Sequence, residues 1–332
     1  MSNLKLKRIV ITGACGAVGS ALVQNLIEND NTVIGLFDNN EEKLFWLSKK
    51  FANHRNYQKL RFQLGDLRDE NRLIKAFYGA DVIFHTAALK HVKLNELNPF
   101  EIVKTNVIGV QNVINAALEN KVEKVIFASS DKAVNPTSSM GASKLLGERL
   151  FIAANSFTGE QKTSFCCVRF GNIINSSGSV IPIFRQQLSN AEPLTITDVG
   201  MTRFLITMDS AIDLLLFSEE TMIGGEIFIA SMGAANILDI AKALNNGEMP
   251  NYNTIGIQSG EKLYEELITE SELRRAYNIA SYVVVLPDLF EGSAVKNQKK
   301  FSEKYKKQLK SDYSLRSDRQ LLSSKDVAKL VI

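Results

Sequence analysis

The first 170 residues alternate short β-branched runs with longer segments whose apolar residues recur at helical spacing. The predicted strands are 8–11, 32–37, 60–64, 81–85, 124–128 and 164–169. The predicted helices between them are 16–29, 41–51, 69–77, 99–120 and 140–155. Several of the strands are unbroken apolar runs, which is typical of parallel strands covered by helices on both faces. The sequence therefore predicts an α/β fold built on a doubly wound parallel sheet.

After residue 170 this alternation weakens. The stretch 170–204 is rich in glycine, serine and proline around one predicted helix at 181–188. A helix at 210–219 and a last sheet strand at 226–230 follow, whereas 237–332 has helical segments and polar loops without a βαβ pattern. We therefore expect two interleaved domains. Residues 1–170 plus 203–234 would form a dinucleotide-binding domain, and residues 171–202 plus 235–332 a smaller, C-terminal substrate-binding domain.

Charge and cysteine content argue against several classes of protein. With 39 Lys+Arg against 36 Asp+Glu, the formal charge is only +3, so nucleic acid is not an expected partner. No apolar run approaches the ~18 residues of a membrane span. Three cysteines without CxxC spacing and three scattered histidines predict neither a disulfide framework nor a metal site. We expect a cytoplasmic protein with reduced thiols.

A glycine-rich turn follows the first predicted strand and opens the first predicted helix. In this turn Gly13 permits a tight bend, Gly16 lets the backbone approach a pyrophosphate, and Gly19 allows close helix–strand packing. The first helical residues, Ala17 and Val18, lie where exposed amides and the positive helix end hold phosphate. The turn predicts a dinucleotide site of the Rossmann type.

Carboxylates end the next two predicted strands. Asp38 lies 19 residues beyond Gly19, where a carboxylate accepts hydrogen bonds from ribose hydroxyls and repels a 2′-phosphate. This position favours NAD over NADP, although Asp38 could instead cap the following helix. Asp66 lies where it could meet the adenine or cap a helix. The small residues Ala87 and Ala88, after the fourth strand, let the backbone lie against a flat cofactor.

The stretch 128–144 leaves the fifth predicted strand at its carboxyl end, where ligands bind in doubly wound sheets. Asp131 and Lys132 are adjacent there. A helix follows, with Met140 and Lys144 four residues apart on one face. Taken alone, the Asp131–Lys132 pair is typical of a charged surface turn.

With these residues the chain resembles an extended short-chain dehydrogenase/reductase, and more narrowly the bacterial UDP-N-acetylglucosamine 4,6-dehydratases. Most such reductases carry Tyr-x-x-x-Lys; Met140 stands at the tyrosine position, and a thioether cannot move a proton. One branch of the dehydratases has Ser-Met-x-x-x-Lys, as Ser139, Met140 and Lys144 do here. The resemblance extends from about residue 7 to 269, and its further shared stretches are 88–92, 98–101, 105–107, 169–172, 201–204 and 260–263. Residues 37–41 are similar to the configuration-retaining members.

The resemblance implies a redox-neutral reaction. Bound NAD would take hydride from sugar C4, water would leave across C5 and C6, and hydride would return to C6, giving a UDP-4-keto-6-deoxy-N-acetylhexosamine for bacterial surface glycan or glycoprotein synthesis. Asp131 would be the acid at the C6 oxygen and Lys132 the base at C5, which requires a lowered lysine pKa. Ser130 would handle the C4 hydroxyl proton in place of the missing phenol at Met140, and Lys144 would orient the ribose.

The resemblance also assigns binding residues. The full predicted cofactor set is Gly13, Gly16, Ala17, Val18, Gly19, Asp38, Asn39, Asp66, Leu67, Ala87, Ala88, Lys90, Asn106 and Lys144. The predicted UDP-sugar set is Lys90, His91, Asn172, Ser179, Val180, Arg203 and Glu261. His91 could equally be structural, and Arg203 or Glu261 taken singly could be surface residues. Gln258 and Ser259 stand where relatives often have Arg-Pro, so one phosphate-binding guanidinium is missing.

Three other functions remain open. One is a configuration-inverting 4,6-dehydratase, although the inverting members more often have a Ser-Arg type sequence, suited to NADP, at the place of residues 37–41. A UDP-hexose 4-epimerase shares fold and cofactor but needs neither a C5 base nor a C6 acid, so Asp131 and Lys132 argue against it. A non-catalytic NAD-binding scaffold would explain Met140 but not the rest of the set. Family membership predicts a homo-oligomer.

Overall fold

One large sheet forms the centre of the molecule, and the computed structural model describes residues 6–158, 162–176, 178–288, 293–309 and 315–331. Within these residues the sheet has ten strands, in the order β15-β13-β14-β10-β6-β5-β4-β1-β2-β3. The first six along the chain are β1 (Lys7–Thr12), β2 (Thr32–Asp38), β3 (Leu60–Leu64), β4 (Val82–His85), β5 (Lys124–Ala128) and β6 (Ser164–Arg169). They are parallel and agree with the six predicted strands to within one residue. The predicted doubly wound α/β fold is confirmed.

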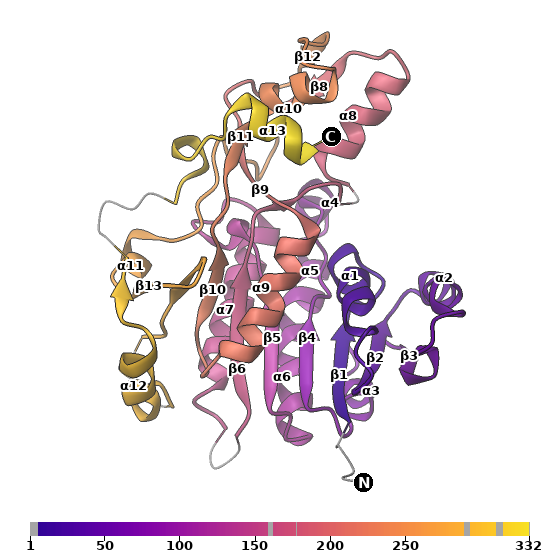
Figure 1. Cartoon of the computed structure of the whole chain (residues 1–332), viewed down its shortest axis with the longest axis vertical. Coiled ribbons are helices and arrows are strands. Elements are labelled where there is room, and N and C mark those ends of the chain that lie inside the picture. Colours follow the sequence, from indigo (N-terminus) through magenta and orange to yellow (C-terminus); the bar gives the residue numbers. More distant parts are fainter. Residues whose placement is uncertain (1–5, 159–161, 177, 289–292, 310–314, 332) are drawn as a thin grey trace.

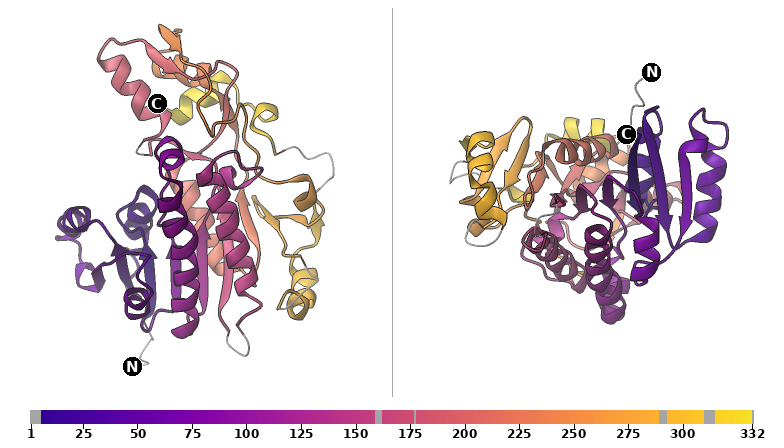
Figure 2. Two further views of the ribbon diagram at one scale, coloured as in Figure 1. Left: turned by 180° about the vertical axis from the view of Figure 1, so that it is seen from behind. Right: turned by 90° about the horizontal axis from the view of Figure 1, so that it is seen from below.

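Helices cover both faces of this sheet (Figures 1 and 2). One face carries α1 (Ala17–Leu26) and α9 (Met208–Thr221), and the other carries α6 (Gly109–Glu119) and α7 (Ser139–Ala154). The shorter α2 (Glu41–Phe51) and α3 (Glu70–Ala76) follow β2 and β3. Because both faces are covered, the central strands are apolar throughout, which is the pattern that identified them. No helix in the described part of the chain is long and apolar enough to cross a membrane.

The predicted helix 99–120 is irregular. It consists of α5 (Pro99–Val103), a π-helical turn at Lys104–Ile108 and α6. Such turns are frequent at functional sites, and this one carries the predicted cofactor residue Asn106. A short helix, α4 (Val92–Leu97), was not predicted because six residues are too few to show helical periodicity.

The expectation that 226–230 is the last sheet strand is wrong. β10 (Ile227–Ala230) pairs in parallel with β6, and β14 (Tyr282–Val285) pairs antiparallel with its other edge. The sheet continues with β13 (Ala276–Ile279) and β15 (Lys307–Gln308). A turn at Ala280 and Ser281 joins β13 to β14, with Ala280 at φ 51°. This turn lacks the Asn-Gly or Asp-Gly pair that identifies a hairpin in a sequence, so the extension was missed.

A second, smaller apolar cluster lies beyond the carboxyl ends of the parallel strands (Figure 1). It draws on residues 174–205, 235–243 and 327–331. Its elements include α8 (Val180–Ser189), β8 (Leu194–Ile196), α10 (Ile237–Leu244) and α13 (Ser324–Val331). The remaining elements after β6 are β7 (Asn172–Ile173), β9 (Thr202–Ile206), β11 (Ala234–Asn236), β12 (Tyr252–Thr254), η4 (Ser317–Arg319), α11 (Glu270–Leu273) and α12 (Ser293–Lys304). Of these, α11 and α12 lie beside the large sheet (Figure 1). The two-domain division stays a prediction. Residues 276–309, which were assigned to the smaller domain, contribute instead to the larger apolar core around the ten-stranded sheet.

A buried ion network ties the second half of the chain to the sheet. Arg169, at the end of β6, is 1% exposed, and its guanidinium donates to both oxygens of Glu148 on α7 at 2.8 and 2.6 Å. It also donates to both oxygens of Glu272 on α11, each at 2.8 Å. Burial raises the pKa of Glu272, but hydrogen bonds and the charge of Arg169 outweigh it and lower the pKa to about 2. Ser129 completes the network with a 2.6 Å bond to Glu148.

Replacement of this arginine should destabilise the fold strongly. Arg169→Met leaves two buried carboxylates without a counter-charge, so we expect the free energy of unfolding to fall by about 3–5 kcal/mol. Arg55→Met is the matched control, because Arg55 is exposed: it pairs with Asp30 at 3.6 Å and donates to the carbonyl of Glu28 at 3.3 Å. Its replacement should change stability by about 1 kcal/mol or less. Denaturant unfolding measures both, and equal effects of the two substitutions would contradict a structural role for the network.

Candidate active site

The glycine turn after β1 packs so closely that side chains cannot be added. Gly13 has φ +72°, and a Cβ there would lie 2.6 Å from the Cα of Ala87. A Cβ on Gly19 would lie 2.2 Å from the carbonyl oxygen of Gly13. Gly16 is the N-cap residue of α1 and offers no side chain to the amides of Ala17 and Val18. The turn therefore presents backbone amides at a helix N-terminus, as a pyrophosphate requires.

Asp38 lies at the rim of this turn. Its Oδ2 accepts from the amide of Cys15 at 2.9 Å and its Oδ1 from the amide of Asn40 at 3.0 Å. Asn40 caps α2 by accepting from Lys43, so the alternative of Asp38 as the helix cap is wrong. A cavity of about 240 Å³ opens here, and Lys43, which the sequence did not single out, lines it. The predicted cofactor residues that line it are Gly13, Gly16, Asp38, Asn39, Asp66, Leu67, Ala87 and Ala88.

The remaining predicted cofactor residues lie outside that cavity. Asn106 uses its amide on the backbone of Leu89, accepting from the nitrogen at 2.8 Å and donating to the oxygen at 3.0 Å. It thereby fixes the turn after β4. Lys144 is buried, donates to the carbonyl of Ala128 at 2.8 Å and lies 4.5 Å above the ring of Phe127. Burial lowers the pKa of Lys144 to about 8.

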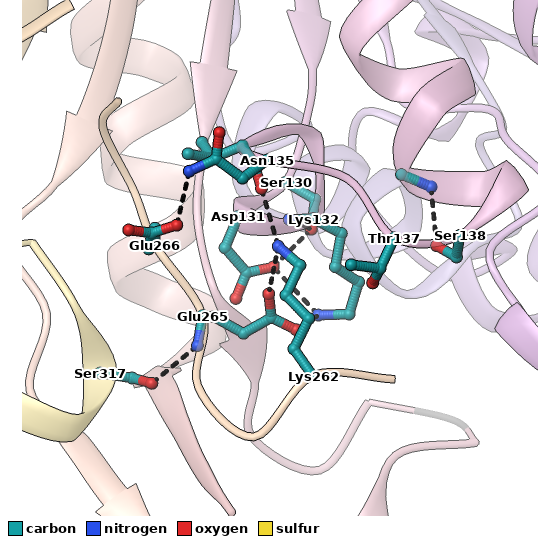
Figure 3. Close-up of polar contacts among 12 residues, drawn as sticks. Ser130, Asp131, Lys132, Asn135, Thr137, Ser138, Lys262, Glu265, Glu266 and Ser317 are labelled. Atoms are coloured by element: carbon teal, nitrogen blue, oxygen red, sulfur yellow. Dashed lines mark hydrogen bonds and ion pairs between the residues drawn. The ribbon is translucent and has the colours of Figure 1, made fainter. Parts of the chain in front are cut away.

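Ser130, Asp131 and Lys132 converge just beyond β5, where the 3₁₀ turn η3 (Asp131–Ala133) begins (Figure 3). Asp131 is fully buried, and its Oδ1 accepts from the Ser130 hydroxyl at 2.8 Å and from Lys132 Nζ at 3.0 Å. Lys132 Nζ also donates to Asn172 Oδ1 at 3.2 Å. Among the described residues, Asp131 Oδ2 has no hydrogen-bond partner. Met140 is buried in the first turn of α7 and carries no transferable proton.

Lys132 has a second carboxylate neighbour that the sequence did not reveal. Glu265 is 3% exposed, and its Oε1 lies 3.6 Å from Lys132 Nζ. Burial lowers the pKa of Lys132, but Asp131 and Glu265 outweigh it, and the net pKa is raised despite the opposing charge of Arg203. The lowered pKa expected for a basic lysine is therefore not found, and the surroundings favour the ammonium form of Lys132.

A second cavity, of about 370 Å³, adjoins this cluster and extends into the smaller half of the molecule. The predicted sugar-binding residues that line it are Asn172, Ser179, Val180, Arg203 and Glu261, together with Lys132, Lys262 and Glu265. Lys90 and His91 do not line it. His91 instead packs against Gly178, where an added Cβ would meet the imidazole at 2.6 Å. Ser179 has a buried hydroxyl without a hydrogen-bond partner among the described residues.

Comparisons with known proteins agree with this architecture. Residues 9–287 match the family described as polysaccharide biosynthesis protein. A UDP-N-acetylglucosamine 4,6-dehydratase (inverting) of Campylobacter jejuni is 40% identical, over 85% of this chain and 84% of that protein. A UDP-glucose 4-epimerase of Rickettsia typhi is 37% identical, over 98% and 95%. The X-ray structure of Pen from Bacillus thuringiensis superposes with a TM-score of 0.89 and 34% identity, over 99% of this chain and 98% of that one. The chain therefore belongs to the polysaccharide biosynthesis protein family, within the extended short-chain dehydrogenase/reductases that include the UDP-N-acetylglucosamine 4,6-dehydratases.

Proposed function

We propose that this protein is a UDP-N-acetylglucosamine 4,6-dehydratase that uses NAD. The observation that carries the proposal is the Asp131–Lys132 pair at the end of β5: the two side chains are 3.0 Å apart, Asp131 is buried, and Lys132 lines the 370 Å³ cavity. A carboxyl group and an amine side by side supply the acid and the base of a water elimination. The Campylobacter relative carries the same activity in its name.

The cofactor cavity fits a nicotinamide dinucleotide. The glycine turn leaves no room for side chains, and Asp38 is fixed at its rim by two backbone amides. When bound, NAD would accept hydride from sugar C4 and return it to C6. Asp38 would accept from the ribose hydroxyls and disfavour the 2′-phosphate of NADP. The part of the cavity wall formed by Asp66, Leu67, Ala87 and Ala88 would contact the adenosine.

The Asp131–Lys132 pair contains every proton that the elimination needs. Without substrate it is an ammonium beside a carboxylate. Movement of one proton from Lys132 Nζ to Asp131 gives an amine for the C5 proton and a carboxylic acid for the C6 oxygen. The amine then takes the C5 proton, the acid protonates the departing hydroxyl as water, and the pair returns to its charged form. Ser130, which donates to Asp131 at 2.8 Å, would take the C4 hydroxyl proton that Met140 cannot and release its own proton to solvent. When hydride returns to C6, the Lys132 ammonium would give a proton to C5 and regain one from solvent.

Two alternatives each have a specific observation behind them. The 37–41 stretch favours retention at C5, whereas the Campylobacter relative is named as inverting. A UDP-hexose 4-epimerase is favoured by the Rickettsia relative, which aligns with 98% of this chain. We place retention first and epimerisation last, because an epimerase has no use for a C5 base and a C6 acid. We also propose a cytoplasmic homo-oligomer that serves surface glycan or glycoprotein synthesis.

The product identifies the reaction. Purified protein incubated with UDP-N-acetylglucosamine, with NAD or NADP added in parallel, should yield a sugar lighter by one water, and faster with NAD. Mass spectrometry detects the loss, and proton NMR of the product should show retained configuration at C5. A product of unchanged mass would indicate the epimerase, and no product would indicate the non-catalytic scaffold.

Lys132→Ala separates oxidation from elimination. The variant should still oxidise C4, seen as absorbance of the reduced cofactor, but should form no dehydrated sugar because the C5 base is missing. Lys329→Ala, on an exposed ion pair with Asp326, is the control and should behave as the unchanged protein. Dehydration by Lys132→Ala at the unchanged rate would refute the role given to Lys132.

A further inference from the structure

Glu265 reaches the end of β5 from the segment that follows Gly260, far along the chain from Lys132. Its carboxylate lies between two lysines, with Oε1 3.6 Å from Lys132 Nζ and Oε2 3.3 Å from Lys262 Nζ (Figure 3). It is 3% exposed, and all three residues line the 370 Å³ cavity. A buried carboxylate is costly unless it is paired. The two lysines provide that pairing at the wall of the cavity.

The backbone of Glu265 is fixed by the C-terminal part of the chain. Its amide donates to Ser317 Oγ at 2.9 Å, and its carbonyl accepts from the Ser317 amide at 2.9 Å. Ser317 is fully buried, and its hydroxyl also lies 2.7 Å from Thr202 Oγ1, next to the cavity residue Arg203. Three segments distant in sequence therefore set the place of this carboxylate. Such over-determined placement is what an accurately held side chain requires.

The ammonium of Lys132 has negatively and positively charged side chains around it. Asp131 and Asn172 accept hydrogen bonds from it, and Glu265 attracts it from a distance too long for a hydrogen bond. Arg203 contributes an opposing positive charge. Two carboxylates, Asp131 and Glu265, attract the Lys132 ammonium, and without Glu265 only Asp131 of these two would remain. Lys132 would then be drawn fully toward the residue to which it must deliver a proton.

We propose that Glu265 is a positioning residue that holds the Lys132 amine at the wall of the sugar cavity, between the Asp131 carboxylate and the sugar. Lys262 pairs with the second oxygen of Glu265 and donates to the carbonyl of Val134 at 2.7 Å, which anchors the carboxylate from its far side. The inference rests on the proposed dehydratase function, and it adds a residue from the C-terminal half to the catalytic arrangement. Glu265 acts through Lys132 and exchanges no proton with the sugar.

Glu265→Gln tests this role, because it removes the charge and keeps the shape. We expect kcat for dehydration to fall about 10- to 100-fold, as for a reacting group misplaced by about 1 Å, with KM changed little. Loss of the negative charge lowers the pKa of Lys132, so the ascending limb of the pH–rate profile should move to lower pH. Glu265→Asp should restore part of the rate. Glu266→Gln is the matched control, since Glu266 accepts from Asn135 at 2.7 Å and does not line the cavity.

A second readout needs no substrate. NMR titration of the labelled lysine side chains should show a lower pKa for Lys132 in Glu265→Gln, and an unchanged one in Glu266→Gln. If the unaltered protein dehydrates its substrate while Glu265→Gln matches it in kcat and in pH profile, the role of Glu265 is refuted and the dehydratase function stands. If Lys132 shifts as expected but the unaltered protein yields no dehydrated sugar, the positioning of the lysine is supported and the dehydratase function fails.

Discussion

A fully buried carboxylate beside an ammonium ion, Asp131 next to Lys132, is the interaction on which the rest of the site depends. Neither charge would persist there alone, because desolvation of an unpaired ion costs several kcal/mol. Together they hold one proton that could move between a buried carboxylate and an amine that lines the cavity. Further pairs of opposite sign extend outward, from Lys132 to Glu265 and from Glu265 to Lys262. Each charge is thus next to one of opposite sign, and the last of them, Lys262, lies at the wall of the 370 Å³ cavity.

The topology explains how these groups meet. Parallel strands end at one edge of the sheet, so the turn after β5 carries Asp131 and Lys132 into the same region as the glycine turn after β1. The smaller half of the chain closes over that edge (Figure 1). Behind the site, Arg169 joins β6, α7 and α11 through two buried carboxylates. The ion network around Arg169 and the one around Lys132 are therefore neighbouring but separate.

Short-range patterns in the sequence identified one part of the fold and of the candidate site. The six parallel strands, the glycine turn, Asp38 and the Asp131–Lys132 pair follow from spacing within a few residues, which a sequence displays directly. The extension of the sheet by β13–β15 depends on a turn without a hairpin signature, and Glu265 meets Lys132 only through the folded chain. The role given to Lys132 requires a lowered pKa, whereas Asp131 and then Glu265 raise it above the effect of burial, and the contribution of Glu265 comes from a segment that the local sequence does not reveal.

The most direct test of the central claim is the fate of the hydrogen at C5 when the reaction runs in deuterium oxide. If the proton of the Asp131–Lys132 pair is exchanged with C5, NMR and mass spectrometry of the 4-keto-6-deoxy product should show deuterium at C5 and the loss of one water. A dehydrated product that carries only its original hydrogen at C5 would contradict the account, because a lysine ammonium exchanged with deuterium oxide should return deuterium to C5 in most turnovers.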